Sequence, residues 1–236
     1  HFKLGEILFK EKQFKDSEKH LKLSISLEEK NAEAEFYLAQ ISRNKDDPNL
    51  AKKHFYKALE INPEFALAYY ELGHHCLGTG DLNEAKIHFQ KATDINQNYA
   101  EAYFYLAKSL RNPSEYDQAY RNYETALEIN PELKECHYQF ANLLSRGEKL
   151  LNDGTLVLKP DAVKAEHHLR KAIDIDPKFY RAYYKLGRLL TNKEDFENSY
   201  LMYKKCIDLN DDFSKAHFHL AVLLMNNKVK CDKEEK

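Results

Sequence analysis

Three basic residues, Arg181, Lys185 and Arg188, have the spacing and chemistry of a carboxylate-binding surface. They lie at positions i, i+4 and i+7, so on a helix they form one positively charged stripe. Tyr184 lies beside the stripe, and Lys215 adds a cation from the next segment of the chain. Guanidinium and ammonium groups in such an array can hold an acidic segment or a terminal carboxylate of a partner. The alternative is a solvated helix face with weak ion pairs.

An aromatic position recurs along the chain beside these polar residues. Its members are Phe2, Phe36, Tyr70, Phe104, Tyr138, Tyr184 and Phe218. Aromatic rings offer a large contact area at low entropic cost and are enriched in binding hot spots. We therefore expect Tyr70, Phe104, Tyr138 and Tyr184 to contact a partner together with the four cations. The alternative is that these rings pack against neighbouring helices of the chain itself.

These positions belong to a sequence repeat that extends with a regular period along almost all of the 236 residues. Leucines recur every 34 residues at Leu4, Leu38, Leu72 and Leu106, and a single step of 46 residues precedes Leu186. Within 66–99, apolar residues follow helical spacing on both sides of a GTGD turn, which predicts two antiparallel helices. One such hairpin cannot bury both apolar faces alone, so neighbouring copies must stack.

Small residues recur where two paired helices would come closest. They are Gly5, Ala39, Gly73, Ala107, Ala141, Gly187 and Ala221. A larger side chain there would push the helices beyond their usual separation of about 8–10 Å. Large side chains are expected to fill the matching gap, and they are Leu21, Phe55, Phe89, Tyr123, Leu169 and Tyr203.

These columns resemble the tetratricopeptide repeat. The match rests on the spacing of Tyr69, Leu72, Gly73, Ala85, Phe89 and Ala92, with Pro63 closing the preceding unit. The resemblance implies an all-α fold, a right-handed α-solenoid of antiparallel helix pairs whose first helices line a concave groove for peptides or helices of a partner. The chain departs from the family pattern because it has no Trp and because Glu29, Gln97 and Asp211 stand where Pro is usual.

We expect one solenoid over residues 1–236. Its units span about 1–31, 32–65, 66–99, 100–133, 134–179 and 180–213, followed by a half unit, 214–227, and a charged tail. The chain starts without Met and in mid-pattern, and its last helix has no second helix to cover it. We therefore expect either that further chain continues the array or that a partner covers its ends.

The 46-residue step places twelve extra residues between the two helices of the fifth unit. Apolar residues flank an Asn152-Asp153-Gly154 turn, which predicts a short hairpin or an extended arm. Its residues Leu156, Val157 and Leu158 either contact a partner or fold back onto the unit's own helices, because an exposed apolar run favours aggregation.

Composition argues against several classes of partner. The net charge of −2 lacks the basic excess that nucleic-acid binding requires, so we expect no nucleic-acid partner. No apolar run approaches the roughly 20 residues of a membrane span, so we expect no membrane insertion. The four cysteines form no CxxC pair, which favours reduced thiols and a cytoplasmic location, with cytoskeletal or ciliary association as a family analogy.

We expect neither a catalytic site nor a metal or other cofactor. The sequence has no glycine-rich phosphate loop, no GxSxG and no HExxH. One column contains His20, His54, His88 and His168, but successive units are offset by roughly 10 Å, too far for one ion to gather the column.

The sequence thus predicts a non-catalytic scaffold or adaptor that binds a protein segment in its groove, within a larger multiprotein assembly. The alternative is a substrate-targeting arm of an enzyme whose catalytic domain lies outside this chain. An RNA-binding helical repeat would need basic columns along the whole groove, whereas only the C-terminal units show them.

Overall fold

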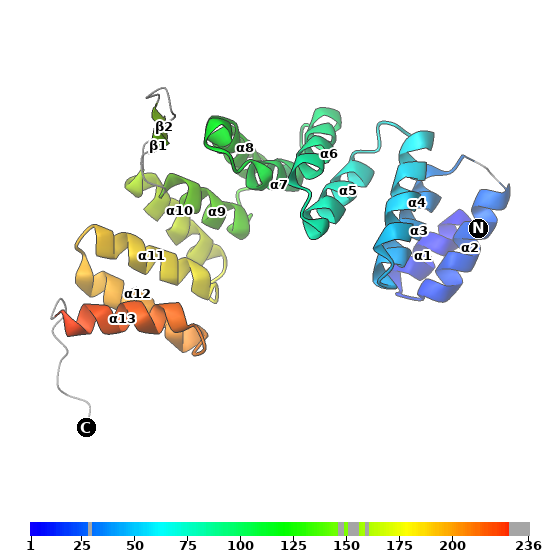
Figure 1. Ribbon diagram of the computed structural model, residues 1–236. Coiled ribbons are helices and arrows are strands. Elements are labelled where there is room, and N and C mark those ends of the chain that lie inside the picture. Colours follow the sequence, from blue (N-terminus) through cyan, green and yellow to red (C-terminus); the bar gives the residue numbers. More distant parts are fainter. Residues whose placement is uncertain (28–29, 146–148, 151–155, 159–160, 227–236) are drawn as a thin grey trace. The chain divides into compact units, whose positions relative to one another are not determined.

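The computed structural model describes residues 1–27, 30–145, 149–150, 156–158 and 161–226. Apart from two short strands, the regular structure of these residues is helical (Figure 1). The chain forms two compact units, His1–Leu110 and Arg111–Lys236. In the part of the chain that is described, no helix is both long and apolar enough to cross a bilayer.

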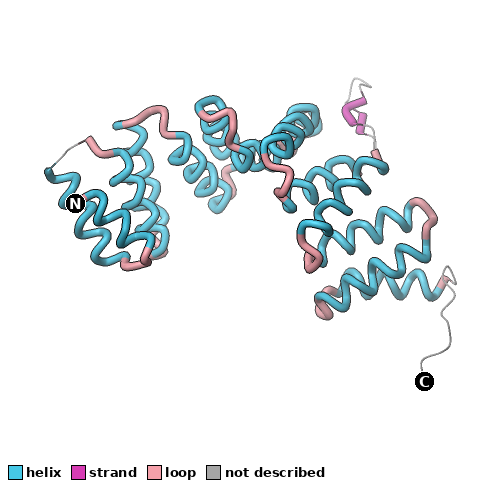
Figure 2. Tube along the Cα trace, turned by 180° about the vertical axis from the view of Figure 1, so that it is seen from behind, coloured by secondary structure: helices cyan, strands magenta, loops and turns pink. Residues whose placement is uncertain are grey.

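The first unit is a series of helical hairpins. It contains α1 (Phe2–Lys10), α2 (Phe14–Leu27), α3 (Ala32–Asn44), α4 (Pro48–Ile61), α5 (Ala66–Thr79), α6 (Leu82–Ile95) and α7 (Ala100–Ser109). Helices α1 and α2, α3 and α4, and α5 and α6 pack as pairs joined by short turns (Figure 2). Each second helix also packs against the first helix of the next pair. The predicted α-helical hairpins are therefore confirmed.

The second unit repeats this arrangement. It contains the 3-10 turn η1 (Pro113–Glu115), α8 (Tyr116–Ile129), α9 (Lys134–Leu144), α10 (Ala162–Ile175), α11 (Tyr180–Asn192), α12 (Phe196–Leu209) and α13 (Ser214–Met225). Helix α9 pairs with α10, and α11 pairs with α12. Between α9 and α10, β1 (Lys149–Leu150) pairs antiparallel with β2 (Leu156–Leu158), as a hairpin requires.

Asparagine and aspartate shape the helix ends and the turns between pairs. Asp47, Asp81 and Asp161 each accept a hydrogen bond from the backbone N–H three residues later and so cap α4, α6 and α10. After α6, the side chain of Asn96 accepts a hydrogen bond from the Asn98 N–H at 3.0 Å. The same bond follows Asn62, where Pro63 comes next. The Asx turn therefore forms at Gln97 without the proline of the family pattern.

The pairing of small and large residues is confirmed at three glycines. A Cβ atom built on Gly73 would lie 2.6 Å from Cε1 of Phe89, and one on Gly187 would lie 2.7 Å from Cε1 of Tyr203. At Gly5 it would lie 2.8 Å from Leu21 Cδ2. The facing side chains of Leu21, Phe89 and Tyr203 are buried. Close helix packing therefore requires the absence of a side chain at these glycines.

Two alanine substitutions on the same helix separate packing from helix propensity. Gly73→Ala forces a methyl group against Phe89, and we expect a loss of about 1–3 kcal/mol in the free energy of unfolding. Gly78→Ala is the matched control, because a Cβ there has no atom within 4 Å, and we expect a gain of up to about 1 kcal/mol. Urea denaturation measures the free energy of unfolding of both variants. Equal changes in Gly73→Ala and Gly78→Ala would contradict a close contact between position 73 and Phe89.

Two histidines contact each other between α9 and α10: His137 is buried and His168 is half-buried. The Nε2–H of His137 donates to the carbonyl oxygen of Pro131 at 3.0 Å, so its Nδ1 accepts from His168 Nδ1–H at 2.8 Å. The His137 imidazole must be neutral in this arrangement, because its Nδ1 accepts a hydrogen bond. Burial, reinforced by the nearby His137, lowers the pKa of His168 to about 4.

We expect this pair to make stability depend on pH. The pKa of His168 is about 6.5 in the unfolded chain and about 4 in the folded chain, so only the unfolded state takes up a proton between these values. Stability therefore falls as pH is lowered from about 6.5 to about 4, by up to about 3 kcal/mol from this group. Urea denaturation at several pH values should show a shallower pH slope for His168→Gln. An unchanged slope would rule out this origin.

Candidate functional site

In the second unit, a cavity of about 740 Å³ opens between α9, α11 and the start of α13. Its lining residues come from these helices and their ends. They are Tyr138, Gln139, Asn142, Ser145, Arg181, Tyr184, Lys185, Arg188, Leu189, Asn192, Phe213 and Lys215. The helices α9, α11 and α13 are alternate helices along the chain, so first helices of successive pairs form the wall. Six of the eight residues expected in the concave groove therefore lie together.

The cavity wall carries four cations. Arg181, Lys185 and Arg188 come from one face of α11, and Lys215 comes from the first turn of α13. No carboxylate is among the described residues that line the cavity. A hydrogen bond to Tyr180 raises the pKa of Arg181, and the charge of Glu135 on α9 contributes to the rise. The Oε1 atom of Glu135 accepts a hydrogen bond from Gln139 at 2.9 Å. The wall therefore presents an excess of positive charge.

Local contacts hold part of this charge in place. The guanidinium of Arg181 lies over the ring of Tyr180, with its Cζ atom 5.8 Å from the centroid, and its Nε donates to the Tyr180 hydroxyl at 3.4 Å. Burial lowers the pKa of His219 on α13, and the positive charge of Arg188 lowers it further. A neutral His219 adds no cation to the site, so its charge comes from arginine and lysine.

Aromatic side chains form the apolar part of the wall. Tyr184 is 7% exposed and packs against Phe213, with ring centroids 5.1 Å apart. Tyr138 is half-buried and packs against Phe179 at 5.2 Å. The Tyr138 ring therefore packs against Phe179 on one side and also borders the cavity. Amphipathic tyrosines in such a position suit a ligand with both apolar and polar groups.

The other two predicted groove aromatics, Tyr70 and Phe104, belong to the first unit. Tyr70 is half-buried in a cluster of rings, with Tyr99 at 4.9 Å and Tyr105 at 5.9 Å between centroids. Phe104 is only 4% exposed, and its ring lies 4.7 Å from that of Tyr105. Phe104 therefore has little surface to offer a partner, in line with the packing alternative for this ring.

None of the described residues that line the cavity belongs to the insertion in the fifth unit. Its strand β2 packs alongside α8, the helix that precedes α9. The side chains of Leu156, Val157 and Leu158 and the Asn152-Asp153-Gly154 turn lie outside the described residues. Contact of this arm with a partner stays a prediction.

Sequence reasoning missed the polar residues that complete the cavity. Asn142 and Ser145 follow Tyr138 by four and seven residues, and Asn192 follows Arg188 by four. This helical spacing was the available signal, because residues four and seven apart share a helix face. Phe213 precedes α13 in the loop, where no helical spacing could place it.

Comparisons with known proteins agree with this geometry. Models of the tetratricopeptide repeat match residues 44–110 and 180–213. No curated protein matches the sequence directly. Among solved structures, pilF from Pseudomonas aeruginosa is 17% identical, with a TM-score of 0.76 over 94% of this chain and 95% of that one.

Two further structures share the fold. YrrB is described as a TPR protein with an unusual peptide-binding site; it is 23% identical, with a TM-score of 0.67 over 84% of this chain and 96% of its own. MamA is also 23% identical, with a TM-score of 0.62 over 75% and 97% of the two chains. The repeat matches, the helical pairs and the shared fold lead to one conclusion: residues 44–110 and 180–213 of this chain contain tetratricopeptide repeats, and the chain has the fold of solved tetratricopeptide-repeat structures.

Proposed function

We propose that the chain is a non-catalytic protein-interaction scaffold that binds an acidic segment of a partner protein in the cavity between α9, α11 and α13. The observation that carries the proposal is the combination of four cations and two tyrosines on one concave wall whose described lining residues include no carboxylate. Complementary charge steers such a partner to the site, and the tyrosines add contact area. The peptide-binding site of YrrB, which has the same fold, supports a peptide ligand.

The neutral polar residues of the cavity suit an extended peptide. Gln139, Asn142 and Asn192 border the same space as the cations. Their side-chain amides both donate and accept hydrogen bonds, as the backbone of an extended peptide requires. The cations would hold carboxylates, while the amides would bond to the peptide backbone. The site would then select acidic segments without demanding one particular sequence.

Fluorescence anisotropy tests this function with three labelled probes. They are a short peptide rich in Asp and Glu, a peptide of the same length with Lys and Arg at the acidic positions, and a single-stranded RNA. We expect the acidic peptide to bind more tightly than the basic one. Its affinity should fall as ionic strength rises from about 0.1 M to about 1 M, because the screening length shrinks from about 10 Å to about 3 Å.

Two outcomes would overturn the proposal. Equal binding of the acidic and basic peptides would show that the cations do not select the ligand. Binding of the RNA without binding of the acidic peptide would assign the positive charge to phosphate recognition instead. A version of the acidic peptide with an amidated C-terminus then separates the contribution of the terminal carboxylate from that of the side chains.

A further inference from the structure

We propose that the α5–α6 hairpin of the first unit holds a zinc-class divalent metal ion on Cys76, Glu84 and His88. Each residue offers one ligand atom, the thiol Sγ, a carboxylate oxygen and an imidazole nitrogen, and these atoms lie within 4.8 Å of one another. The site is independent of the proposed peptide-binding cavity, because all three residues belong to the first unit.

The hairpin itself brings the three side chains together. Cys76 lies in the last turns of α5, and Glu84 lies in the first turn of α6. Gly80 ends α5 with a positive φ of 83°, a conformation that glycine adopts without strain, and so reverses the chain between them. Glu84 and His88 are four residues apart and share one face of α6. The ligand set is therefore fixed by local structure rather than by long-range folding.

His88 is the strongest indication of a ligand. Its residue surface is 7% exposed, and neither ring nitrogen has a hydrogen-bond partner among the described residues. A buried polar group without a partner is unfavourable and calls for an explanation. The Nε2 atom is directed toward Glu84, with 3.6 Å between it and Oε1. Burial lowers the pKa of His88, so the ring is neutral and has a lone pair available for a metal.

The spacing of the His88 and Glu84 ligand atoms and the donor types of all three residues agree with zinc. Bonds of about 2.0–2.3 Å in a tetrahedral site place adjacent ligand atoms roughly 3.3–3.6 Å apart. The 3.6 Å between His88 Nε2 and Glu84 Oε1 matches this spacing. A sulfur, a nitrogen and an oxygen donor together favour Zn²⁺ over Mg²⁺ or Ca²⁺, which prefer oxygen ligands alone. Glu84 is half-buried, so a water molecule can supply a fourth ligand from the solvent side.

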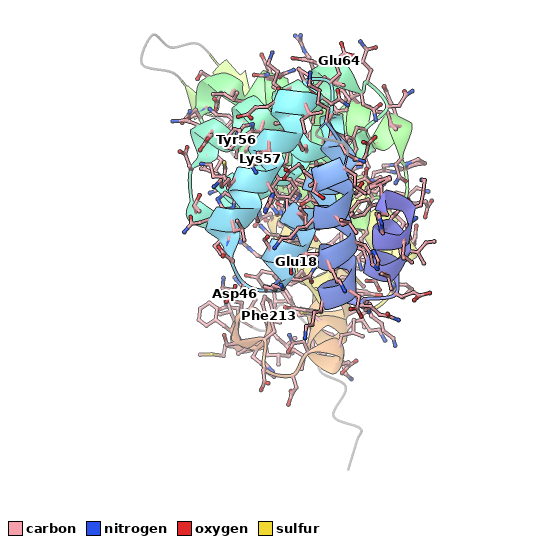
Figure 3. The ribbon with its side chains drawn as sticks, turned by 90° about the vertical axis from the view of Figure 1, so that its right-hand side faces the viewer. Glu18, Asp46, Tyr56, Lys57, Glu64 and Phe213 are labelled. Carbon is pink, nitrogen blue, oxygen red and sulfur yellow. The ribbon has the colours of Figure 1, made fainter. Side chains whose placement is uncertain are left out.

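Neighbouring side chains would orient the ligands. Tyr56 on α4, labelled in Figure 3, donates its hydroxyl hydrogen to Glu84 Oε1 at 3.0 Å. The rings of Tyr56 and Tyr69 lie 6.2 Å and 6.1 Å from that of His88, between centroids, and so limit its rotation. Such outer contacts hold metal ligands in place in known sites. Lys52 opposes binding, because its ammonium lies 3.5 Å from Glu84 Oε2 and must give way to a cation.

Metal binding here must release a proton. Burial and a hydrogen bond to Glu84 together raise the pKa of the Cys76 thiol to about 11. The thiol is therefore protonated at neutral pH, and a metal ion would have to displace its proton to form the metal–sulfur bond. Affinity should increase with pH, and calorimetric titrations in buffers of different ionisation enthalpy should report about one proton released per ion bound.

Cobalt and zinc are the probes for this site. We expect one equivalent of Co²⁺ to give a thiolate-to-metal charge-transfer absorption that Zn²⁺ abolishes, and Zn²⁺ alone to raise the unfolding temperature of the chain. Cys76→Ser should remove the absorption, and His88→Gln should weaken Co²⁺ binding at least tenfold. Cys206→Ser and Cys231→Ser are matched controls that remove a thiol elsewhere, and both should retain the signal.

Three results would overturn the proposal: no absorption in the parent protein, an absorption that persists in Cys76→Ser, or loss of the signal in either control. Circular dichroism of each variant shows that its helices are formed. Should Cys76→Ser fail to fold, Glu84→Gln provides the same test from a half-buried position, with metal affinity as the readout. Acidic-peptide binding is measured on the same samples, so failure of the metal site leaves the peptide-binding proposal separately tested.

Discussion

Replacing Arg181, Lys185 and Arg188 together with glutamate should weaken binding of the acidic peptide by about two orders of magnitude. The three cations line one cavity from a single face of α11. Reversal of each charge costs about 1 kcal/mol, so three reversals cost roughly 3 kcal/mol in binding free energy. Fluorescence anisotropy at constant ionic strength measures the dissociation constants.

A matched set of lysines on the same unit provides the control. Lys178, Lys204 and Lys205 are exposed and do not line the cavity. Replacing these three with glutamate changes the net charge by the same amount, so we expect only a small loss of affinity from the long-range field. Equal losses in the two variants would mean that net charge, and not the cavity, attracts the peptide. Circular dichroism should show unchanged helical content in both.

Phe89→Ala should lower the free energy of unfolding by about 3–5 kcal/mol, the typical cost of deleting a fully buried phenylalanine ring. The side chain of Phe89 is 0% exposed, fills the gap beneath Gly73 and stacks with Tyr105 at 5.6 Å. Its removal leaves a cavity between α5 and α6 that the backbone contact at Gly73 cannot close. Urea denaturation monitored by circular dichroism measures the loss.

The control for this variant lies two residues earlier on the same helix. Ile87 is 61% exposed, so Ile87→Ala removes an apolar side chain with little change in buried contacts. We expect a change within about 0.5 kcal/mol, as for most surface substitutions. A loss below about 1 kcal/mol for Phe89→Ala would contradict the role of the small and large columns in holding the helices together.

Much of the fold could be predicted from the sequence because the same contacts between small and large side chains recur in successive repeats. Gly73 faces Phe89 and Gly187 faces Tyr203, as the columns indicated. Contacts between neighbouring units recur with the repeat, so agreement between columns identifies them. The basic stripe was also predictable, because its three residues belong to one helix and their spacing places them on the same face.

Features that depend on particular side-chain conformations could not be predicted in this way. The aromatic column has one sequence pattern, yet Phe104 is 4% exposed whereas Phe218 is 64% exposed. The exposed fraction of each ring depends on the helices packed against it, which cannot be predicted from the repeat spacing. Phe213 borders the cavity from a loop, and Cys76 meets His88 across a turn. A search for ligands within one column could not detect that last pair, because its members occupy different columns.

Site-mapped photo-crosslinking tests the central claim most directly. An acidic peptide that carries a photoreactive residue is cross-linked to the intact chain, and mass spectrometry locates the modified residues. Binding in the proposed cavity predicts cross-links on α9, α11 and the first turn of α13, around Tyr138, Lys185 and Lys215, and their loss in the triple glutamate variant. Cross-links concentrated on α10 and α12, or in residues 1–110, would contradict it.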